Sequence, residues 1–296
     1  MDIEPTTNYP SFVEEVLDAA ETSARLNTMA DGFEAIRPLG LEDAGRVLWD
    51  MPLHKYPRLS KVLPPMTPSD ITIHWAGAAG HDLLQKSVSF VRSCAANYTE
   101  ITGHSLVGKR IIDFGCGYGR FLRLFSMYSD DVYGVDAWEV SLEHSRAAGF
   151  GDRIALSAAV PSELVFVGFD FLFAFSIFTH LSETATISAL KALRKSAVDG
   201  AVLAITTRPV EFWETAAQHG THLKADQVPV SKLVADHQSS GFAFYVEGME
   251  DTEGQHYGDT SLSTDWLREH AIGWRIEKFD RSLNDPMQRY VFLRAV

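Results

Sequence analysis

Apolar and polar positions follow helical spacing in the first third of the chain. Between Tyr9 and Phe33, apolar residues recur every three or four positions with acidic residues between them, which predicts one or two amphipathic helices. Residues 51–70, MPLHKYPRLSKVLPPMTPSD, hold five of the twelve prolines, and proline cannot continue a helix. We therefore expect an extended connector there, followed by a helix from about Asp82 to Tyr98.

From residue 105 onward, strand patterns alternate with helix patterns. KRIIDF, DVYGVD, RIALS, FDFLFAFSIF and AVLAITT predict strands, and FDFLFAFSIF is apolar on both faces, as buried parallel strands are. RFLRLFSMY, WEVSLEHSRAAG and ETATISALKALRKSAVDG predict helices between them, the last two closed by Gly149 and Gly200. GWRIEKFD and QRYVFLRAV predict two final strands joined by a short loop, as in an antiparallel pair.

This alternation predicts an α/β fold with a Rossmann-like, mostly parallel seven-stranded sheet and an antiparallel C-terminal strand. Residues 1–104 form an N-terminal helical cap or substrate-side extension in this interpretation, and residues 105–296 form the sheet domain. Residues from 208 to about 260 interrupt the alternation, which predicts a lid-like insertion. The N-terminal helices are expected to close over the site, and a homodimer is the competing use of their apolar faces.

Charge and composition narrow the class of partner. The formal net charge is −13, which repels phosphate backbones and anionic lipids, so we expect a small-molecule partner rather than nucleic acid or a membrane. Cys94 and Cys116 are too few for a disulfide framework. The N-terminus lacks the pattern of a signal peptide, and the longest apolar stretch is about half of a membrane span. These features predict a cytoplasmic protein.

Residues 111–120, IIDFGCGYGR, indicate a nucleotide-binding turn. Glycines between a strand and a helix let a ligand approach the backbone and its free N–H groups. The spacing of Gly115, Gly117 and Gly119 is G-x-G-x-G, whereas a dinucleotide fingerprint is G-x-G-x-x-G, and Arg120 stands where its last glycine belongs. Asp113 would repel a pyrophosphate, but it would favour a ligand that carries ammonium and sulfonium charges.

The stretch IIDFGCGYGR resembles the first motif of class I S-adenosylmethionine-dependent methyltransferases, and the resemblance covers roughly residues 105–296. It implies S-adenosylmethionine as cofactor, with the ribose hydroxyls on Asp136 and the adenine stacked on Trp138. The family often has an acidic residue after the third strand, but LSAAVPSE has none at that place, so Ser157 or a backbone carbonyl is expected to hold the adenine amino group. The expected cofactor-binding residues are Asp113, Gly115, Cys116, Gly117, Tyr118, Gly119, Asp136, Ala137, Trp138, Phe175, Arg58 and Trp75.

The segment FSIFTHL, at the end of the fourth expected strand, resembles the strand end of small-molecule methyltransferases, where the acceptor binds. A hydroxyl acceptor must lose a proton, and histidine titrates in the useful range. His180 is therefore the candidate general base or acceptor-orienting group. A histidine that bonds to the backbone or caps the next helix is the competing interpretation.

The flanking segments are loosely similar to methyltransferases found with bacterial glycan and secondary-metabolite genes. That similarity implies a hydroxylated small molecule or a saccharide as acceptor, bound by Thr179, Tyr257 and Tyr56. It also implies that Arg58 pairs with the carboxylate of the cofactor and that Trp75 lies at the cofactor mouth. Tyr56 and Trp75 fit equally well as core residues.

Motifs of other substrate classes are missing from the sequence. No Asn/Asp-Pro-Pro-Tyr/Phe follows the fourth strand, and neither cysteine stands in a Pro-Cys pair. The histidines at positions 219, 222, 237 and 256 are too irregularly spaced for a metal site, so we expect no metal. The sequence thus favours O-methylation of a small hydroxylated or saccharide acceptor. N- or C-methylation, a non-catalytic S-adenosylmethionine-binding protein and a nicotinamide-dependent oxidoreductase stay open.

Overall fold

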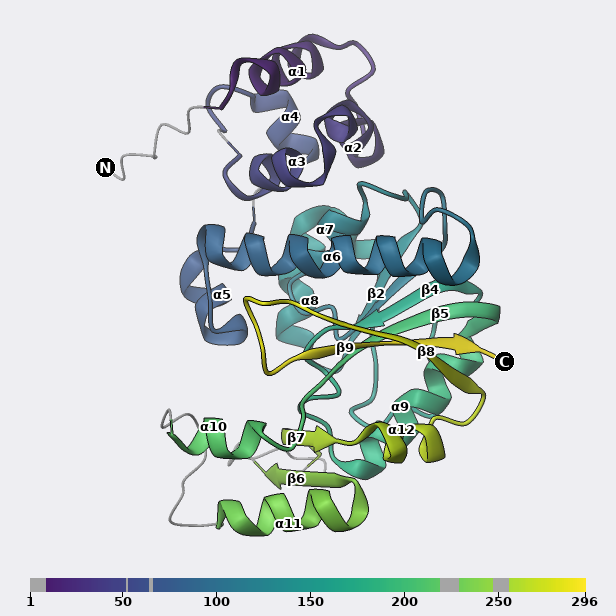
Figure 1. The fold of residues 1–296 in the computed structure, drawn as a ribbon. Coiled ribbons are helices and arrows are strands. Elements are labelled where there is room, and N and C mark those ends of the chain that lie inside the picture. Colours follow the sequence, from purple (N-terminus) through teal and green to yellow (C-terminus); the bar gives the residue numbers. More distant parts are fainter. Residues whose placement is uncertain (1–8, 52, 64–65, 219–228, 247–255) are drawn as a thin grey trace.

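The computed structural model of the chain describes residues 9–51, 53–63, 66–218, 229–246 and 256–296. The described chain begins with helices, continues as a sheet with helices on both faces, and carries a small insertion before its last strands (Figure 1). The N-terminal elements are α1 (Ser11–Thr22), α2 (Met29–Ile36), the 3-10 turn η1 (Arg37–Leu39), α3 (Gly40–Trp49), α4 (Pro57–Val62), α5 (Ser69–Ala76) and α6 (Gly80–Thr102).

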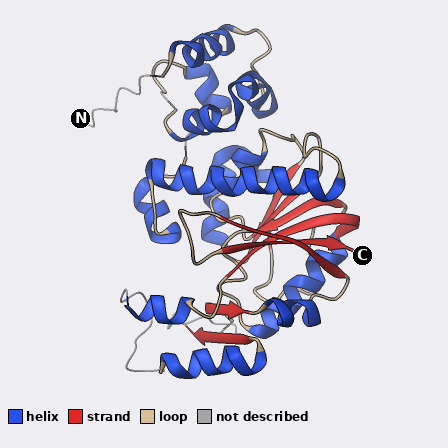
Figure 2. Cartoon of the chain, viewed as in Figure 1, coloured by secondary structure: helices blue, strands red, loops and turns tan. Residues whose placement is uncertain are grey.

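The central sheet has seven strands in the order β3-β2-β1-β4-β5-β9-β8 (Figure 2). Neighbours from β3 to β5 pair in parallel, whereas β9 is antiparallel to both β5 and β8. The strands are β1 (Ile111–Phe114), β2 (Val132–Asp136), β3 (Ile154–Leu156), β4 (Phe169–Ala174), β5 (Ala197–Thr207), β8 (Trp274–Arg281) and β9 (Arg289–Ala295). The predicted mostly parallel sheet with one antiparallel strand is confirmed.

Helices cover both faces of the sheet because successive side chains of a strand point to opposite faces. Ile111 packs against α6, α7 (Arg120–Phe125) and α8 (Glu139–Ser145), whereas its neighbour Ile112 packs against α9 (Glu183–Ser196) and α12 (Thr264–His270). The short turns η2 (Arg146–Phe150) and η3 (Gly151–Arg153) follow α8. Two apolar cores on one parallel sheet leave its carboxyl edge open for a site.

The N-terminal helices are present, as predicted, and α1 to α4 lie on the outside of α6. Helices α1 to α4 share a core of their own, and α3 packs on the outside of α6 and α7, where Gly45 faces Leu84 and Leu124 (Figure 1). The carboxyl ends of the parallel strands lie on the other side of α6. Of this N-terminal part, α5 lies nearest those ends. Helices α1 to α4 thus buttress the sheet domain rather than cover its edge.

The proline-rich segment 51–70 forms helices where we expected a connector. Pro57 is the first residue of α4, and Pro68 is the N-cap of α5. A proline at the start of a helix costs nothing, because the first N–H groups have no partner within the helix. The prolines therefore mark where these helices begin.

Two boundaries differ from the prediction near β5 and beyond it. Helix α9 ends at Ser196, and residues 197–200 extend β5 because Ala197 pairs with Phe169 across a register shift. The insertion holds α10 (Phe212–Gln218), α11 (Val230–Ser240) and an antiparallel hairpin of β6 (Phe242–Val246) and β7 (Gly258–Leu262). A small core of its own includes Trp213 and Leu233.

Candidate functional site

The glycine turn joins β1 to α7 at the carboxyl edge of the sheet. Gly115, Gly117 and Gly119 have φ of +85°, +52° and +79°, a region that side chains strongly disfavour. The turn is anchored to β2, because the Gly115 and Cys116 N–H groups both donate to the Val135 carbonyl, at 2.8 and 3.0 Å. The turn is therefore held by its own glycines and by hydrogen bonds to the neighbouring strand β2.

The three glycines have different packing reasons. A Cβ on Gly115 would lie 2.1 Å from Ile177 Cδ1, and one on Gly119 would lie 2.9 Å from Ser145 Oγ. A Cβ on Gly117 would meet nothing within 4 Å. Two of the glycines thus make room for the protein itself, and Gly117 faces open space. It is the glycine whose backbone a ligand can approach.

Asp136 ends β2 and ties the glycine turn to the next helix. One carboxylate oxygen accepts from the Gly117 N–H at 2.8 Å, and the other accepts from the Trp138 N–H at 2.8 Å. Burial raises the pKa of Asp136, and these backbone hydrogen bonds oppose that rise. Both oxygens thus bond to the backbone, which holds the carboxylate at the end of β2.

Asp113 is the most unusual group of the site. Its carboxyl is 1% exposed, and neither oxygen accepts a hydrogen bond from the described residues. Burial raises the pKa of Asp113 well above its ordinary value, against the opposing effect of Arg120. A buried carboxylate without donors is costly. Its place beside the glycine turn therefore fits a ligand that brings a positive N–H group.

Aromatic groups surround the turn on the α6 side. Arg120 lies over the rings of Phe121 and Phe175, at 4.5 and 5.2 Å. Phe175 also packs edge-on against Phe90 at 4.8 Å, so this expected cofactor residue belongs partly to the core. The Tyr118 hydroxyl is buried and has no partner among the described residues. It is a second polar group that a ligand here can satisfy.

Two exposed apolar side chains lie beyond Asp136. Trp138 is 43% exposed and follows Ala137 at the start of α8, whereas Leu156 is 51% exposed at the end of β3, where it pairs with Asp136. The sequence analysis named Trp138 and missed Leu156. An apolar residue that ends an expected strand was the available signal. Their positions suit a flat ring beside a ribose on Asp136.

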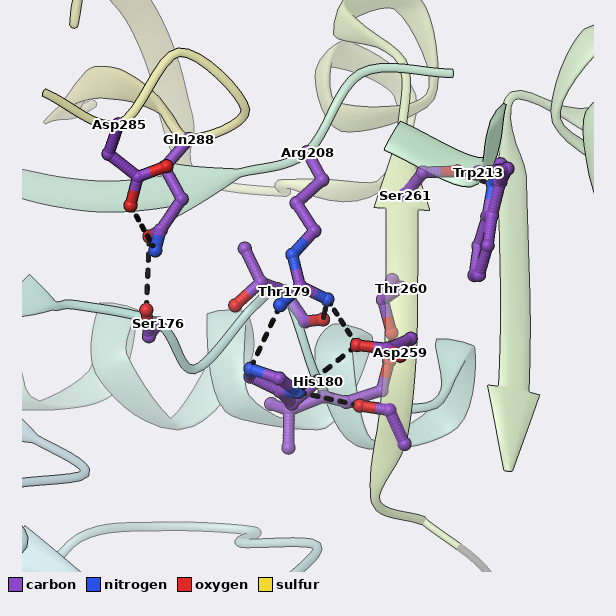
Figure 3. Close-up of polar contacts among 12 residues, drawn as sticks. Ser176, Thr179, His180, Arg208, Trp213, Asp259, Thr260, Ser261, Asp285 and Gln288 are labelled. Carbon is purple, nitrogen blue, oxygen red and sulfur yellow. Dashed lines mark hydrogen bonds and ion pairs between the residues drawn. The ribbon is translucent and has the colours of Figure 1, made fainter. Parts of the chain in front are cut away.

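The segment after β4 is strained. Ser176 has φ +57° and is the one residue other than glycine with positive φ in the described part of the chain. Its N–H donates to Thr206 Oγ1 at 2.7 Å, and its hydroxyl donates to the Gln288 side-chain oxygen at 3.0 Å. The Thr206 side chain on β5 and the Gln288 side chain just before β9 therefore hold the strained turn, and Figure 3 shows the contact between Ser176 and Gln288. The turn brings Ile177 onto Gly115.

His180 is surrounded by hydrogen-bond partners. Its Nδ1 lies 2.7 Å from the Gly258 carbonyl oxygen, and its Nε2 lies 3.2 Å from Arg208 Nη2. Arg208 also forms a short ion pair with Asp259, and the two side chains are 13% and 9% exposed (Figure 3). The sequence analysis missed Arg208 and Asp259, which are 51 residues apart and carry no motif.

Thr179 and Tyr257 both lie beside His180. The Thr179 side chain is fully buried, and its hydroxyl has no partner among the described residues. The Tyr257 ring stacks on the His180 ring, with centroids 5.2 Å apart and planes 10° apart. The structure therefore brings these three expected acceptor-side residues together.

The structure does not bring Tyr56 or Arg58 to this edge. Tyr56 is 1% exposed in the core of the N-terminal helices, and the Arg58 guanidinium donates to the carbonyls of Glu21 and Ser23 at 2.5 and 2.8 Å. Burial and these bonds fix both side chains within α1 to α4. Trp75 belongs to α5, and its side chain lies outside the described part of the structure.

Within the described residues, no group of three or more His, Cys, Asp or Glu side chains is arranged to hold a metal ion. His219 and His222 lie outside those residues. Cys94 and Cys116 are buried, unpaired thiols. No described helix combines the length and the apolar character needed to cross a membrane.

Comparison with known proteins gives one family. The family model described as a methyltransferase domain matches residues 86–240, more than half of the chain. No curated protein matches. The fold is similar to magnesium protoporphyrin IX methyltransferase from Synechocystis PCC 6803 with bound SAH, at TM-score 0.51 and 14% identity, over 77% of this chain and 93% of that one. It is also similar to a protein from Pyrococcus horikoshii OT3, at TM-score 0.50 and 13% identity, over 70% of this chain and 90% of that one.

Proposed function

The chain belongs to the methyltransferase family, and we propose that it methylates a hydroxyl oxygen of a small hydroxylated or saccharide acceptor. Its methyl donor is S-adenosylmethionine. When bound, this cofactor supplies a methyl group activated by a positively charged sulfur. The observation that carries the assignment of the donor site is the buried, unpartnered Asp113 carboxylate beside the open backbone of Gly117.

The donor site uses residues from β1, β2 and the turn between them. Asp113 would accept from the amino group of the donor, which removes the cost of its unpaired buried charge. The Asp136 carboxylate would accept from the ribose hydroxyls. Trp138 and Leu156 would flank the adenine through their exposed apolar surface. Their burial by a ring is worth about 25 cal/mol per Å² of apolar area.

The acceptor would approach from the ends of β4 and β5. Thr179 offers a buried hydroxyl without a partner, and Tyr257 offers an exposed ring face. A cavity of about 240 Å³ opens between the end of β5, the start of β9 and the insertion, although Thr179 and Tyr257 do not line it. Its lining includes Thr207, Glu211 and Arg289, a mixture of charged and hydroxyl groups that suits a polar acceptor. The volume matches a ring-sized group.

The protein's share of the reaction is mainly positioning. Transfer requires the acceptor oxygen to lie in line with the methyl group, and rigid placement of both reactants supplies a large part of the acceleration. The strained Ser176 turn and the buried groups around His180 give this edge the required rigidity. His180 lies beside Thr179 and Tyr257 on the acceptor side, as an orienting group or as proton acceptor.

Methylation of an amine nitrogen is the second candidate. Both ring nitrogens of His180 already have partners within the protein. A neutral amine attacks without prior loss of a proton, so it needs no base at this edge. A hydroxyl acceptor depends on proton removal more than an amine does, so the hydrogen bonds of His180 within the protein favour an amine.

We also propose that the enzyme works in the cytoplasm on small molecules. Its net charge of −13 disfavours nucleic acid and anionic membrane surfaces, and its two thiols are unpaired. A homodimer through exposed apolar side chains of the N-terminal helices, such as Phe12, is compatible with this proposal.

The test is incubation with methyl-labelled S-adenosylmethionine and a small-molecule extract, followed by mass analysis of the labelled products. We expect label on an oxygen of a hydroxylated or saccharide compound. Label on nitrogen would select the second candidate, and label on carbon would overturn both. Binding of S-adenosylhomocysteine without transfer to any component would indicate a non-catalytic binding protein.

A further inference from the structure

Arg208 is one of the contacts between the insertion and the loop after β4, and its side chain is only 13% exposed. Arg208 directly follows β5, and its guanidinium reaches three acceptors. Nη1 donates to the Thr179 carbonyl at 2.9 Å and pairs with the Asp259 carboxylate, whereas Nη2 donates to His180 Nε2. The face of the guanidinium lies over the Phe212 ring at 4.1 Å. Because the Arg208 guanidinium is largely removed from water and bonded to several groups, it holds in place the segments that supply those groups.

These partners also determine the protonation of His180. A guanidinium only donates hydrogen bonds, so Nε2 of His180 must accept. The opposite nitrogen, Nδ1, faces the Gly258 carbonyl oxygen and must carry the proton. The basic lone pair of the ring is therefore directed at Arg208. In this arrangement both ring nitrogens of His180 bond to other groups of the protein. Neither nitrogen is then available to take a proton from the acceptor.

Backbone contacts join the same two segments. The Gly258 N–H donates to the His180 carbonyl at 2.8 Å, and the Thr260 N–H donates to the Thr179 carbonyl at 2.9 Å. The Thr260 hydroxyl donates to the Leu181 carbonyl at 2.6 Å. Residues 256–260 thus run antiparallel beside residues 179–182, with a bridge between Leu181 and Tyr257. The residues that lead into β7 therefore pair with the loop after β4 as one strand pairs with another.

We propose that Arg208, Asp259 and His180 form a clamp, the Arg208 clamp, that holds β7 on the loop after β4 and presents the Tyr257 ring to a sugar or aromatic ring of the acceptor. Tyr257 is 40% exposed, and its ring is parallel to that of His180, so one face is supported and the ring can stack on a flat or saccharide surface. The class of acceptor rests on the proposed function. The clamp itself rests on the contacts above.

Within the Arg208 clamp, all three members are positioning residues. His180 stacks on Tyr257 and accepts the hydrogen bond from Arg208. The proton of a hydroxyl acceptor passes to water in this proposal. Arg208 and Asp259 act through His180 and through the backbone of β7. This distinguishes the clamp from general-base catalysis, in which loss of the imidazole removes the proton acceptor whatever replaces it.

The first experiment needs no acceptor. Amide hydrogen exchange is measured by residue in the full-length protein and in the Arg208→Gln and Asp259→Asn variants. We expect the Gly258 and Thr260 amides to exchange at least tenfold faster in both variants, with the β1 amides unchanged. Unchanged protection at Gly258 and Thr260 would overturn the clamp. Arg268→Gln, which removes an exposed pair with Asp265 on α12, is the matched control and should change neither region.

The second experiment separates positioning from base catalysis. His180→Gln keeps an acceptor for Arg208, His180→Asn keeps a donor for the Gly258 carbonyl, and His180→Ala keeps neither. None of the three can take up a proton near neutral pH. With labelled S-adenosylmethionine and extract, we expect the glutamine or the asparagine variant to keep at least a third of the maximal rate, and the alanine variant to lose tenfold or more. An equal loss of 100-fold or more in all three, with normal amide protection, would overturn the positioning role.

The role of Tyr257 is tested by measuring how much extract is needed for half-maximal labelling. Tyr257→Ala should raise that amount at least tenfold and leave the maximal rate within threefold, whereas Tyr257→Phe should match the original protein. Equal behaviour of the alanine variant and the original protein would overturn the stacking surface. If the original protein transfers no label to the extract, the proposed function fails, and the exchange experiment still decides the clamp.

Discussion

The loop after β1 and the loop after β4 lie at the same edge of the sheet, but they are held differently. The glycine turn is hydrogen-bonded to partners no more than 28 residues away: the Gly119 N–H donates to the Cys116 carbonyl, and the Ser145 hydroxyl donates to the Gly117 carbonyl at 2.8 Å. The loop after β4 is fixed by side chains far along the chain, with Gln288 112 residues from Ser176. The donor half is therefore built from local sequence, and the acceptor half exists only when the whole fold has assembled.

The largest effect on the donor half is expected for Gly115→Ala. The added Cβ would lie 2.1 Å from Ile177 Cδ1 at a φ of +85°, so both packing and backbone oppose it. We expect a loss of about 2–4 kcal/mol in the free energy of unfolding, combined from strain and overpacking, and undetectable S-adenosylhomocysteine binding. Thermal unfolding and calorimetry measure the two quantities.

Gly117→Ala is the matched control for Gly115→Ala. Its Cβ would meet nothing within 4 Å of protein, so we expect only the strain of a positive φ, about 1 kcal/mol. S-adenosylhomocysteine binding should nevertheless weaken, because the new methyl group points into the open space. Unchanged affinity with a stable protein would show that the ligand does not approach Gly117.

Arg208→Met should have the largest effect on the acceptor half. Removing one partner of a buried ion pair leaves Asp259 buried and unpaired, which costs about 3–5 kcal/mol. The double variant Arg208→Met/Asp259→Leu should recover most of that stability in urea unfolding. Methyl transfer should stay low in both variants, because neither restores the contact with His180. Recovery of transfer in the double variant would contradict the positioning role of Arg208.

Asp113→Asn tests the donor half through the pH dependence of stability. Burial raises the folded-state pKa of Asp113 above its unfolded value of 3.8. The stability that the neutral carboxyl contributes is therefore present below about pH 4 and is lost as pH rises toward the folded pKa. The variant has no such loss, so its melting temperature should exceed that of the original protein increasingly from pH 4 to pH 7. Parallel curves would contradict an unpaired Asp113.

Ser176→Gly should have the smallest effect. It relieves the strain of φ +57° and removes the hydroxyl bond to Gln288, two changes of about 1 kcal/mol with opposite sign. We expect the melting temperature to stay within a few degrees. Ser176→Val keeps the strain and loses the bond, so it should destabilise by more than Ser176→Gly. The reverse order would show that the turn is not strained.

This contrast also explains what the sequence predicted. The seven strands, the glycine turn and the position of Asp136 follow from spacing within short windows, because each depends on neighbours in the chain. Helices α4 and α5 were missed because their prolines stand at helix starts, where proline is tolerated. Pattern alone could not separate a proline that begins a helix from one that prevents it.

The acceptor half could not be predicted in the same way. Arg208 and Asp259 carry no motif, and only the fold brings them to His180. Arg58 and Tyr56 were placed at the site by resemblance, but Tyr56 belongs to the separate core of α1 to α4 and Arg58 bonds to the carbonyls of Glu21 and Ser23. Contacts that join distant segments depend on tertiary packing, which leaves no periodic signal in the sequence.

The most direct test of the division between the two halves is the affinity for S-adenosylhomocysteine, measured by calorimetry on two variants side by side. Asp113→Asn removes a charge-assisted hydrogen bond worth about 1.5–3 kcal/mol and should weaken binding about 10- to 100-fold. Arg208→Gln alters only the acceptor half and should bind within twofold of the original protein. Equal weakening in the two folded variants would contradict the account, because the donor site would then depend on the Arg208 clamp.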